Sequence, residues 1–331
     1  MGEWCVANLP TTMTRRFALL QVLISLIALG AVVWWASHQE APHVPTTGRA
    51  ILYMASAALL YTLATVVRAE RWHQILHLIG VDARRADSYS LTTVGYMGNN
   101  VLPARAGEML RVVLLDLRTQ AGKRSLLGTI VAERLLDAAV LGAIFLLTVY
   151  GVLEGDVLPT DRPLLIAGVG FLLLLIGAGA FSVLRRRGAL QRLRDFARPL
   201  AGAPRSLTGR TGAILLLVTV LLWALEGGVY LTVARAVELD ISTSGAFYLV
   251  ALTNFVAALP AAPGSIGTFD AAVAFGARAL GGAGSVVITY VLLLRFILYV
   301  PITMVGLVIL VVRYGGWSRL RDAARLQTSR A

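Results

Sequence analysis

The chain has 331 residues, of which 57% are hydrophobic and only 15% are charged, and its mean hydropathy is +0.74. Soluble globular proteins carry about a quarter charged residues, so this composition excludes an ordinary soluble domain. The net charge of +12 does not indicate a nucleic-acid partner, because the arginines lie in short segments between apolar runs, where membrane topology places them.

Six apolar stretches are long enough to cross a bilayer as helices, since about twenty apolar residues span roughly 30 Å of hydrocarbon. They are Phe17–Ala36, Ala50–Val67, Ser125–Tyr150, Pro163–Leu184, Thr211–Ala236 and Ser285–Val312. The first stretch follows Arg15 and Arg16, but it is too long for the core of a signal peptide and ends in a poor cleavage site. We therefore expect an uncleaved first span and a single membrane domain over residues 1–331.

Two further apolar regions, 89–115 and 247–280, are interrupted by proline and glycine. The arm from Tyr89 to Leu102 could reach only about 21 Å at 1.5 Å per residue, which is too short to cross. We predict that both regions are re-entrant hairpins, each of which enters and leaves the membrane on one side. The predicted fold is thus an all-α polytopic membrane protein with about six transmembrane helices and two re-entrant broken-helix hairpins.

The distribution of basic residues supports this topology. With a cytoplasmic N-terminus, the segments predicted to be cytoplasmic hold 22 Arg or Lys residues, and those predicted to be outside hold 4. If both hairpins crossed, the basic loop 185–210 would face the side opposite to the Arg-rich segment 68–86. We therefore predict a cytoplasmic-membrane protein in which both termini, loop 185–210 and tail 313–331 are cytoplasmic. The loop is either an amphipathic helix on the inner leaflet or a solvated basic segment.

The two interrupted regions resemble each other. Leu-Pro-Ala-Arg-Ala-Gly at 102–107 aligns without gaps on Leu-Pro-Ala-Ala-Pro-Gly at 259–264. Three predicted spans separate them, so the two halves would have opposite orientations, which predicts an inverted repeat of the kind found in secondary transporters. Half-helices that begin after Gly107 and Gly264 would offer free N–H groups to an anion. The alternative is two unrelated helix breaks.

Nine charged residues fall inside apolar segments: Arg105, Glu108, Arg111, Glu133, Arg134, Asp137, Glu226, Asp270 and Arg295. Each costs about 2.5–3.5 kcal/mol at a helix centre, so partners or a function are expected. Arg105 and Arg111, beside a break, are interpreted as anion ligands. Glu133, Arg134 and Asp137 form either a structural ion-pair network or part of the site. Glu226 and Arg295 are expected to pair with each other or with the hairpins.

The candidate substrate-binding residues are these nine together with Asn99, Asn100, Asn254 and Gly264 at the breaks. No catalytic triad and no phosphate-binding glycine loop is found, and His73 and His77 lack a third metal ligand. A single cysteine, Cys5, cannot form an intramolecular disulfide. We expect no catalytic residues, no metal and no cofactor.

Three motifs in chain order carry a family resemblance. They are Gly98-Asn99-Asn100-x-Leu102-Pro103-x-Arg105-x-Gly107-Glu108-x-x-Arg111, Glu133-Arg134-Leu135-Leu136-Asp137 and Pro263-Gly264-Ser265-Ile266-Gly267-Thr268-Phe269-Asp270. They resemble the lysylphosphatidylglycerol synthase transmembrane family, the flippase-like domain of the multiple-peptide-resistance proteins. Asp270 replaces the family's usual Glu, and Ser265 replaces a common Gly. The family's soluble aminoacyl-transferase domain is absent from these residues, so we expect no lipid aminoacylation and no enzyme activity.

The resemblance implies a flippase-like transporter that moves an anionic or phosphate-bearing lipid or glycolipid between leaflets. Arg105 and Arg111 would bind the phosphate, while Glu108, Glu133, Asp137 and Asp270 would balance charge or accept protons. The expected partners are membrane lipids, either anionic phospholipids or polyprenyl-phosphate-linked glycolipids. A membrane-embedded enzyme acting on a lipid head group, or a partner subunit of a lipid-modifying enzyme or glycosyltransferase, are the alternatives.

Overall fold

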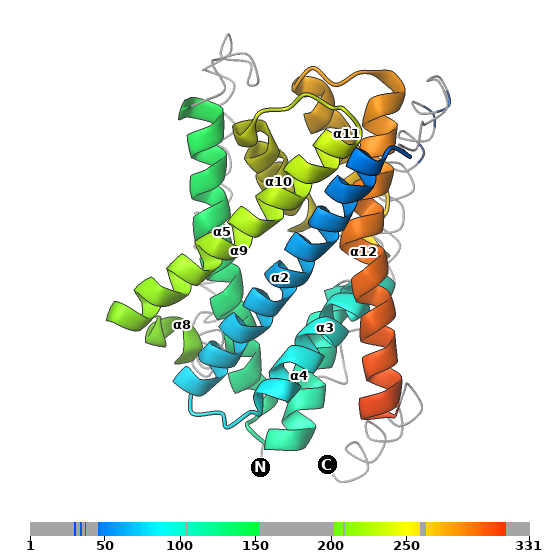
Figure 1. Cartoon of the computed structure of the whole chain (residues 1–331). Coiled ribbons are helices and arrows are strands. Elements are labelled where there is room, and N and C mark those ends of the chain that lie inside the picture. Colours follow the sequence, from blue (N-terminus) through cyan, green and yellow to red (C-terminus); the bar gives the residue numbers. More distant parts are fainter. Residues whose placement is uncertain are drawn as a thin grey trace, which may run out of the picture.

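The protein is built from helices that cross one another (Figure 1). The computed structural model describes residues 46–102, 105–151, 202–207, 209–258 and 263–315, together with the single residues Gly30, Trp34 and Ser37. No strand occurs among these residues, as predicted for an all-α protein. The predicted span Pro163–Leu184, the span Phe17–Ala36 apart from Gly30 and Trp34, most of loop 185–210, and the tail after Gly315 lie outside the described residues.

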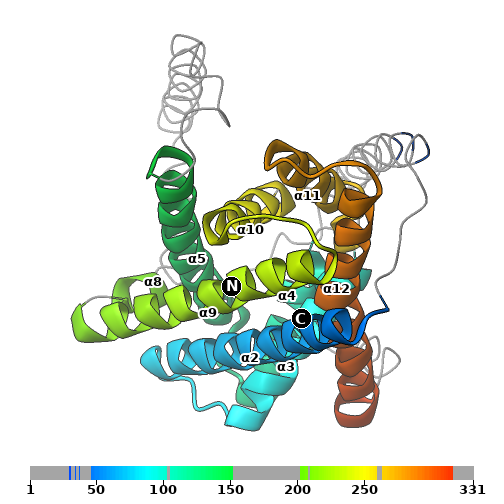
Figure 2. The same cartoon turned by 45° about the horizontal axis from the view of Figure 1, so that its top comes forward.

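Within the described residues, three helices are long and apolar enough to cross a membrane: α2 (Gly48–Leu78), α9 (Gly209–Ala236) and α12 (Gly284–Tyr314). The shortest, α9, has 28 residues and extends about 42 Å at 1.5 Å per residue. Helices α2 and α9 lie side by side over much of their length (Figures 1 and 2). A fourth long helix, α5 (Lys123–Gly151), covers another predicted span, and the short α8 (Gly202–Ser206) packs against it.

Helix α2 extends further than the sequence predicted. The expected span ended at Val67 because Arg68 and Arg71 were assigned to a cytoplasmic segment, but the helix continues to Leu78. Both arginines are buried, with exposed fractions of 4% and 1%. The helix therefore continues beyond the predicted span, and the last part of α2 is a buried element of the protein.

The first interrupted region forms two helices, α3 (Arg85–Val101) and α4 (Ala106–Thr119), that pack against each other. Glycines allow this close approach: a Cβ atom at Gly98 would lie 2.6 Å from the Cα of Gly107. The break ends at Arg105, whose φ of 53° is in the left-handed region that few non-glycine residues adopt. The predicted break is therefore confirmed, and its glycines are needed for helix packing.

The second interrupted region forms α10 (Thr243–Ala258), a short 3-10 turn η2 (Pro263–Ser265) and α11 (Thr268–Ala279). Gly264 and Gly267 have φ values of 63° and 84°, which glycine adopts without steric cost. Figure 1 shows α10 and α11 near one end of the molecule and α3 and α4 near the other. The two breaks approach each other, because a Cβ atom at Gly264 would lie 3.2 Å from the carbonyl oxygen of Asn100.

An ion-pair cluster joins the first hairpin to α12 at the end away from the breaks. Asp87 at the start of α3 accepts hydrogen bonds from Arg118 at 2.5 Å and from Arg313 at 2.8 Å. Arg313 also donates to the hydroxyl of Ser90 at 2.9 Å. The open end of the α3–α4 pair is thus fixed to the last long helix.

Candidate functional site

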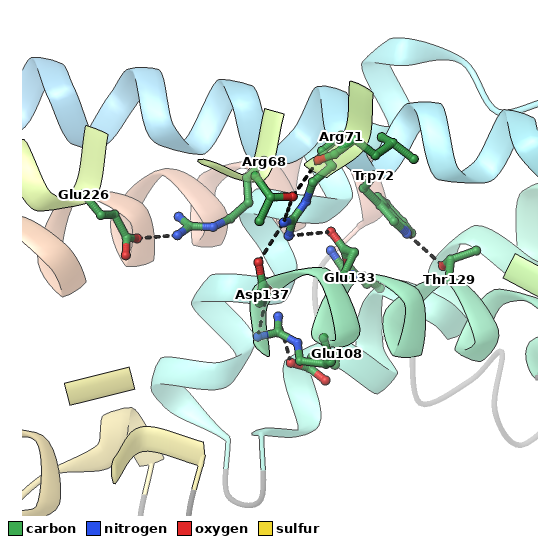
Figure 3. A network of polar contacts seen from close by, with 12 residues as sticks. Arg68, Arg71, Trp72, Glu108, Thr129, Glu133, Asp137 and Glu226 are labelled. Atoms are coloured by element: carbon green, nitrogen blue, oxygen red, sulfur yellow. Dashed lines mark hydrogen bonds and ion pairs between the residues drawn. The ribbon is translucent and has the colours of Figure 1, made fainter. Parts of the chain in front are cut away.

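A buried ion-pair network lies where α2, α4, α5 and α9 meet (Figure 3). Arg71 of α2 is at its centre and is almost fully buried. Its Nη1 donates to Asp137 at 2.7 Å and to the Thr219 hydroxyl at 2.9 Å, and its Nη2 lies 3.7 Å from Glu133. Glu133 also binds Arg111. These contacts provide the partners that buried charges require in a membrane.

Arg111 contributes packing as well as charge. Its guanidinium lies 4.4 Å from the centre of the Trp72 ring, a cation–π geometry. Trp72 is fully buried, and its indole N–H donates to the hydroxyl of Thr129 at 3.0 Å. Arg111 therefore holds α4 against α2 and α5.

A second buried pair, Arg68 and Glu226, joins the two long helices α2 and α9. The Arg68 guanidinium lies 5.0 Å from the centre of the Tyr96 ring and 5.7 Å from that of Trp223. The two helices are thereby linked through a charged contact that two aromatic rings partly enclose.

The more exposed branch of the network consists of Arg105, Glu108 and Arg134. Glu108 lies 3.5 Å from Arg105 and 3.4 Å from Arg134, and Arg134 lies 3.5 Å from Asp137. The predicted i, i+3 contact between Arg134 and Asp137 is thus confirmed. The Arg105 and Arg134 side chains are 40% and 39% exposed, so both keep donor capacity.

A cavity of about 360 Å³ opens between the two breaks and this network. Its wall includes eight of the predicted site residues: Asn99, Asn100, Arg105, Arg134, Asp137, Glu226, Asn254 and Gly264. The break residue Arg105 also donates to the carbonyl oxygen of Ala257 at the end of α10, 3.3 Å away. The structure therefore brings both interrupted regions to one site.

The other five predicted residues do not line the cavity. They are Glu108, Arg111, Glu133, Asp270 and Arg295, and each forms an ion pair in the layer around it. Arg111 in particular lies behind the cavity, only 3% exposed. Of the two arginines predicted to bind an anion, only Arg105 faces the cavity.

The side chain of Asp270 lies at the N-terminus of α11, where the sequence predicted that a ligand anion would bind. Its carboxylate accepts from the backbone N–H of Gly267 at 2.9 Å and caps α11. Arg295 donates two hydrogen bonds to the same carboxylate, at 2.6 and 2.8 Å, and a third to the Gly264 carbonyl at 3.2 Å. Glu226 and Arg295 thus have separate partners, and the α11 terminus carries its own anion.

Several residues of the cavity wall have a buried polar atom with no hydrogen-bond partner among the described residues. Three are donors, Nη1 of Arg68, Nε of Arg134 and Nε1 of Trp223, and one is an acceptor, Oδ1 of Asn99. The net charge of the network is positive, because it holds five arginines and four carboxylates. An excess of donors and positive charge is suited to an anionic group with several acceptor oxygens.

Fourteen of the described lining residues are not among the predicted site residues, and four of these are Arg68, Tyr96, Trp223 and Tyr299. The two tyrosines and the tryptophan were indistinguishable from ordinary apolar span residues. Arg68 could have been found, because no glycine or proline follows it until Gly80 and a helix was free to continue. No group of three or more His, Cys, Asp or Glu side chains in the described part of the chain is arranged to hold a metal.

The fold and cavity define a helical membrane protein with several apolar helices and broken helices around a charged interior site. The chain belongs to the family described as the lysylphosphatidylglycerol synthase TM region, whose sequence profile matches residues 18–306. The family proposed from the three motifs is therefore confirmed.

Two curated relatives match shorter segments. The chain is 30% identical over 90 residues to the UPF0104 membrane protein MJ1595 of Methanocaldococcus jannaschii, covering 27% of each chain. It is 24% identical over 138 residues to Glycosyltransferase AglD of Haloferax volcanii, covering 41% of this chain and 22% of that protein. The chain thus matches about a quarter of the length of each relative. No solved structure matches the chain.

Proposed function

We propose that the protein is a flippase-like transporter that moves a phosphate-bearing lipid between the leaflets of the cytoplasmic membrane. The observation that carries this proposal is the cavity at the two breaks, with Arg105 and Arg134 facing it and unpaired donors on Arg68 and Trp223. Membrane proteins tolerate interrupted helices where the break lines a wet cavity. A cavity of about 360 Å³ has room for about a dozen waters, at roughly 30 Å³ each.

The arrangement of the helices supports alternating access. In each half a long helix precedes a broken pair and another follows it: α2 and α5 flank α3–α4, and α9 and α12 flank α10–α11. We interpret these halves as an inverted repeat whose hairpins enter from opposite sides of a six-span bundle. Each hairpin would close the cavity toward its own side, so that the head group reaches one leaflet at a time.

The names of relatives agree with a lipid substrate. The family is named after a synthase of lysylphosphatidylglycerol, and one relative is named a glycosyltransferase. We infer that the partners are membrane lipids, with a lipid-modifying enzyme or a glycosyltransferase as a further partner. We do not expect head-group chemistry, because Glu108, Asp137 and Glu226 are each engaged in an ion pair with arginine.

The anion site is tested by replacing both exposed arginines. We expect Arg105→Gln combined with Arg134→Gln to weaken binding of short-chain phosphatidic acid by about tenfold or more, since charged hydrogen bonds contribute about 1.5–3 kcal/mol each when desolvated. The same variant should slow flipping of a fluorescent phosphatidylglycerol in vesicles, measured by dithionite quenching of one leaflet. Arg105→Lys should give a partial loss, because it keeps the charge but loses the two-pronged geometry.

The matched control is Arg235→Gln, which removes an arginine from an exposed ion pair with Asp240 outside the cavity. It should leave binding and flipping unchanged. Wild-type affinity and flipping in a well-folded Arg105→Gln, Arg134→Gln protein would refute the anion site.

The orientation of the chain gives a separate prediction. Asp82 lies in the loop between α2 and α3, and Asp240 in the loop between α9 and α10, and both are exposed. In a Cys5→Ser background, Asp240→Cys should react with a membrane-impermeant maleimide in intact cells, whereas Asp82→Cys should react only after lysis. Labelling of both positions in intact cells would contradict a cytoplasmic N-terminus with two hairpins.

A further inference from the structure

The proposed phosphate ligands account for only part of the cavity wall. Of the 22 lining residues in the described part of the chain, 7 are aromatic, whereas aromatic residues make up 8% of the whole chain. These seven are Tyr61, Tyr96, Trp223, Tyr230, Phe255, Phe269 and Tyr299. A phosphate group alone does not account for this aromatic surface, because it binds proteins through its negative charge and its acceptor oxygens.

Two of these tyrosines are partly exposed and held in place. The Tyr96 ring lies against the Arg68 guanidinium, and the Tyr299 ring lies 4.7 Å from the Arg295 guanidinium. Tyr299 also makes an edge contact with Phe269, with ring centres 5.4 Å apart. Rings fixed in this way form preorganised surfaces, on which a flat apolar face can pack at little entropic cost.

Polar groups between the rings can both donate and accept. The hydroxyls of Tyr61, Tyr96 and Tyr299 make no hydrogen bond to any described residue, and the Asn99 side-chain oxygen has no partner. The unpaired indole N–H of Trp223 adds a donor. A ligand that satisfies this set carries several hydroxyl groups, since a hydroxyl also donates and accepts.

We propose that the lipid head group carries a sugar next to its phosphate. This inference rests on the proposed function and adds the substrate class: a glycosylated lipid phosphate. Arg105 and Arg134 take the phosphate, the C–H face of the sugar packs on Tyr96 and Tyr299, and its hydroxyls bind Asn99 and Trp223. The cavity volume of about 360 Å³ leaves room for a sugar beyond the phosphate.

The test compares two soluble phosphodiester probes that carry the same single negative charge and differ in the sugar: farnesyl methyl phosphate and farnesyl phosphate esterified with a single hexose. Binding is measured by thermophoresis with the whole protein in nanodiscs. We expect the hexose-bearing probe to bind at least about tenfold more tightly. Tyr96→Leu should remove most of that advantage without changing the affinity for farnesyl methyl phosphate, and Tyr96→Phe should remove part of it.

The control variant is Phe275→Leu, which changes an aromatic side chain that is 66% exposed and outside the cavity. It should bind both probes as the wild type does. Tyr299→Leu provides a second test of the ring surface if Tyr96→Leu does not fold.

Each outcome decides one of the two proposals. Equal affinity of the wild-type protein for both probes would overturn the sugar site and leave the phosphate site intact. No binding of either probe would overturn the proposed function itself. A sugar advantage that persists in the Tyr96→Leu and Tyr299→Leu proteins would overturn the role of the aromatic rings.

Discussion

Replacing Glu226 with alanine is expected to lower the free energy of unfolding by about 3–5 kcal/mol, because it leaves the buried Arg68 charge without its partner. An arginine cannot escape this cost by losing its proton. The loss is measured by reversible unfolding in mixed detergent micelles. The double replacement Arg68→Leu, Glu226→Leu should recover most of the stability, because it removes both charges.

The control is Asp240→Ala, which breaks an ion pair with Arg235 whose acidic side chain is 95% exposed. Exposed pairs contribute less than about 1 kcal/mol, so this variant should unfold almost as the wild type does. Equal stability of the Glu226→Ala and Asp240→Ala proteins would show that the Arg68–Glu226 contact is not a buried pair.

Replacing Gly107 with alanine is expected to prevent the first hairpin from closing. The added Cβ would overlap the Gly95 carbonyl oxygen and the Asn99 backbone nitrogen, and neither can move without separating α3 from α4. Inserting one methyl group into a tight core lowers the free energy of unfolding by about 1–3 kcal/mol. Because this clash is with backbone atoms, we expect a loss at or above the upper end of that range. The yield of monodisperse protein after detergent extraction and the melting temperature both report this effect.

Gly142→Ala is the matched control, because a Cβ at this position of α5 would meet no atom within 4 Å. Alanine is favoured over glycine in a helix by about 0.5–1 kcal/mol, so this variant should be slightly more stable than the wild type. A Gly107→Ala protein with normal yield and melting temperature would contradict the close packing of α3 on α4.

The sequence predicted those structural features that are determined by residues close together in the chain. Proline and glycine stop helices by their own geometry, so the breaks after Val101 and Ala258 could be predicted, and residues three apart on one helix gave the Arg134–Asp137 pair. The capping of α11 by Asp270 also has a local cause, since an acidic residue in the first turn satisfies free N–H groups. The prediction of an external anion at that terminus is therefore wrong, because the Asp270 carboxylate already lies there.

Contacts between helices could not be predicted in this way. Arg68 and Glu226 are 158 residues apart, and their contact depends on how α2 crosses α9, which periodicity along either helix does not specify. Hydropathy also favoured ending α2 before Arg68, although buried partners let the helix carry its arginines into the interior. The same limit applied to the aromatic residues of the cavity wall, which come from six different helices.

The surplus of one arginine over the carboxylates in the cavity network has an electrical consequence. A head group with a single negative charge would make the loaded site neutral, so that the step carrying the lipid would move no net charge through the membrane field. The empty site would keep its positive charge, and one elementary charge moved through 100 mV corresponds to about 2.3 kcal/mol. A membrane potential that is negative inside would then act on the return of the empty protein and favour the state in which its cavity faces the cytoplasm.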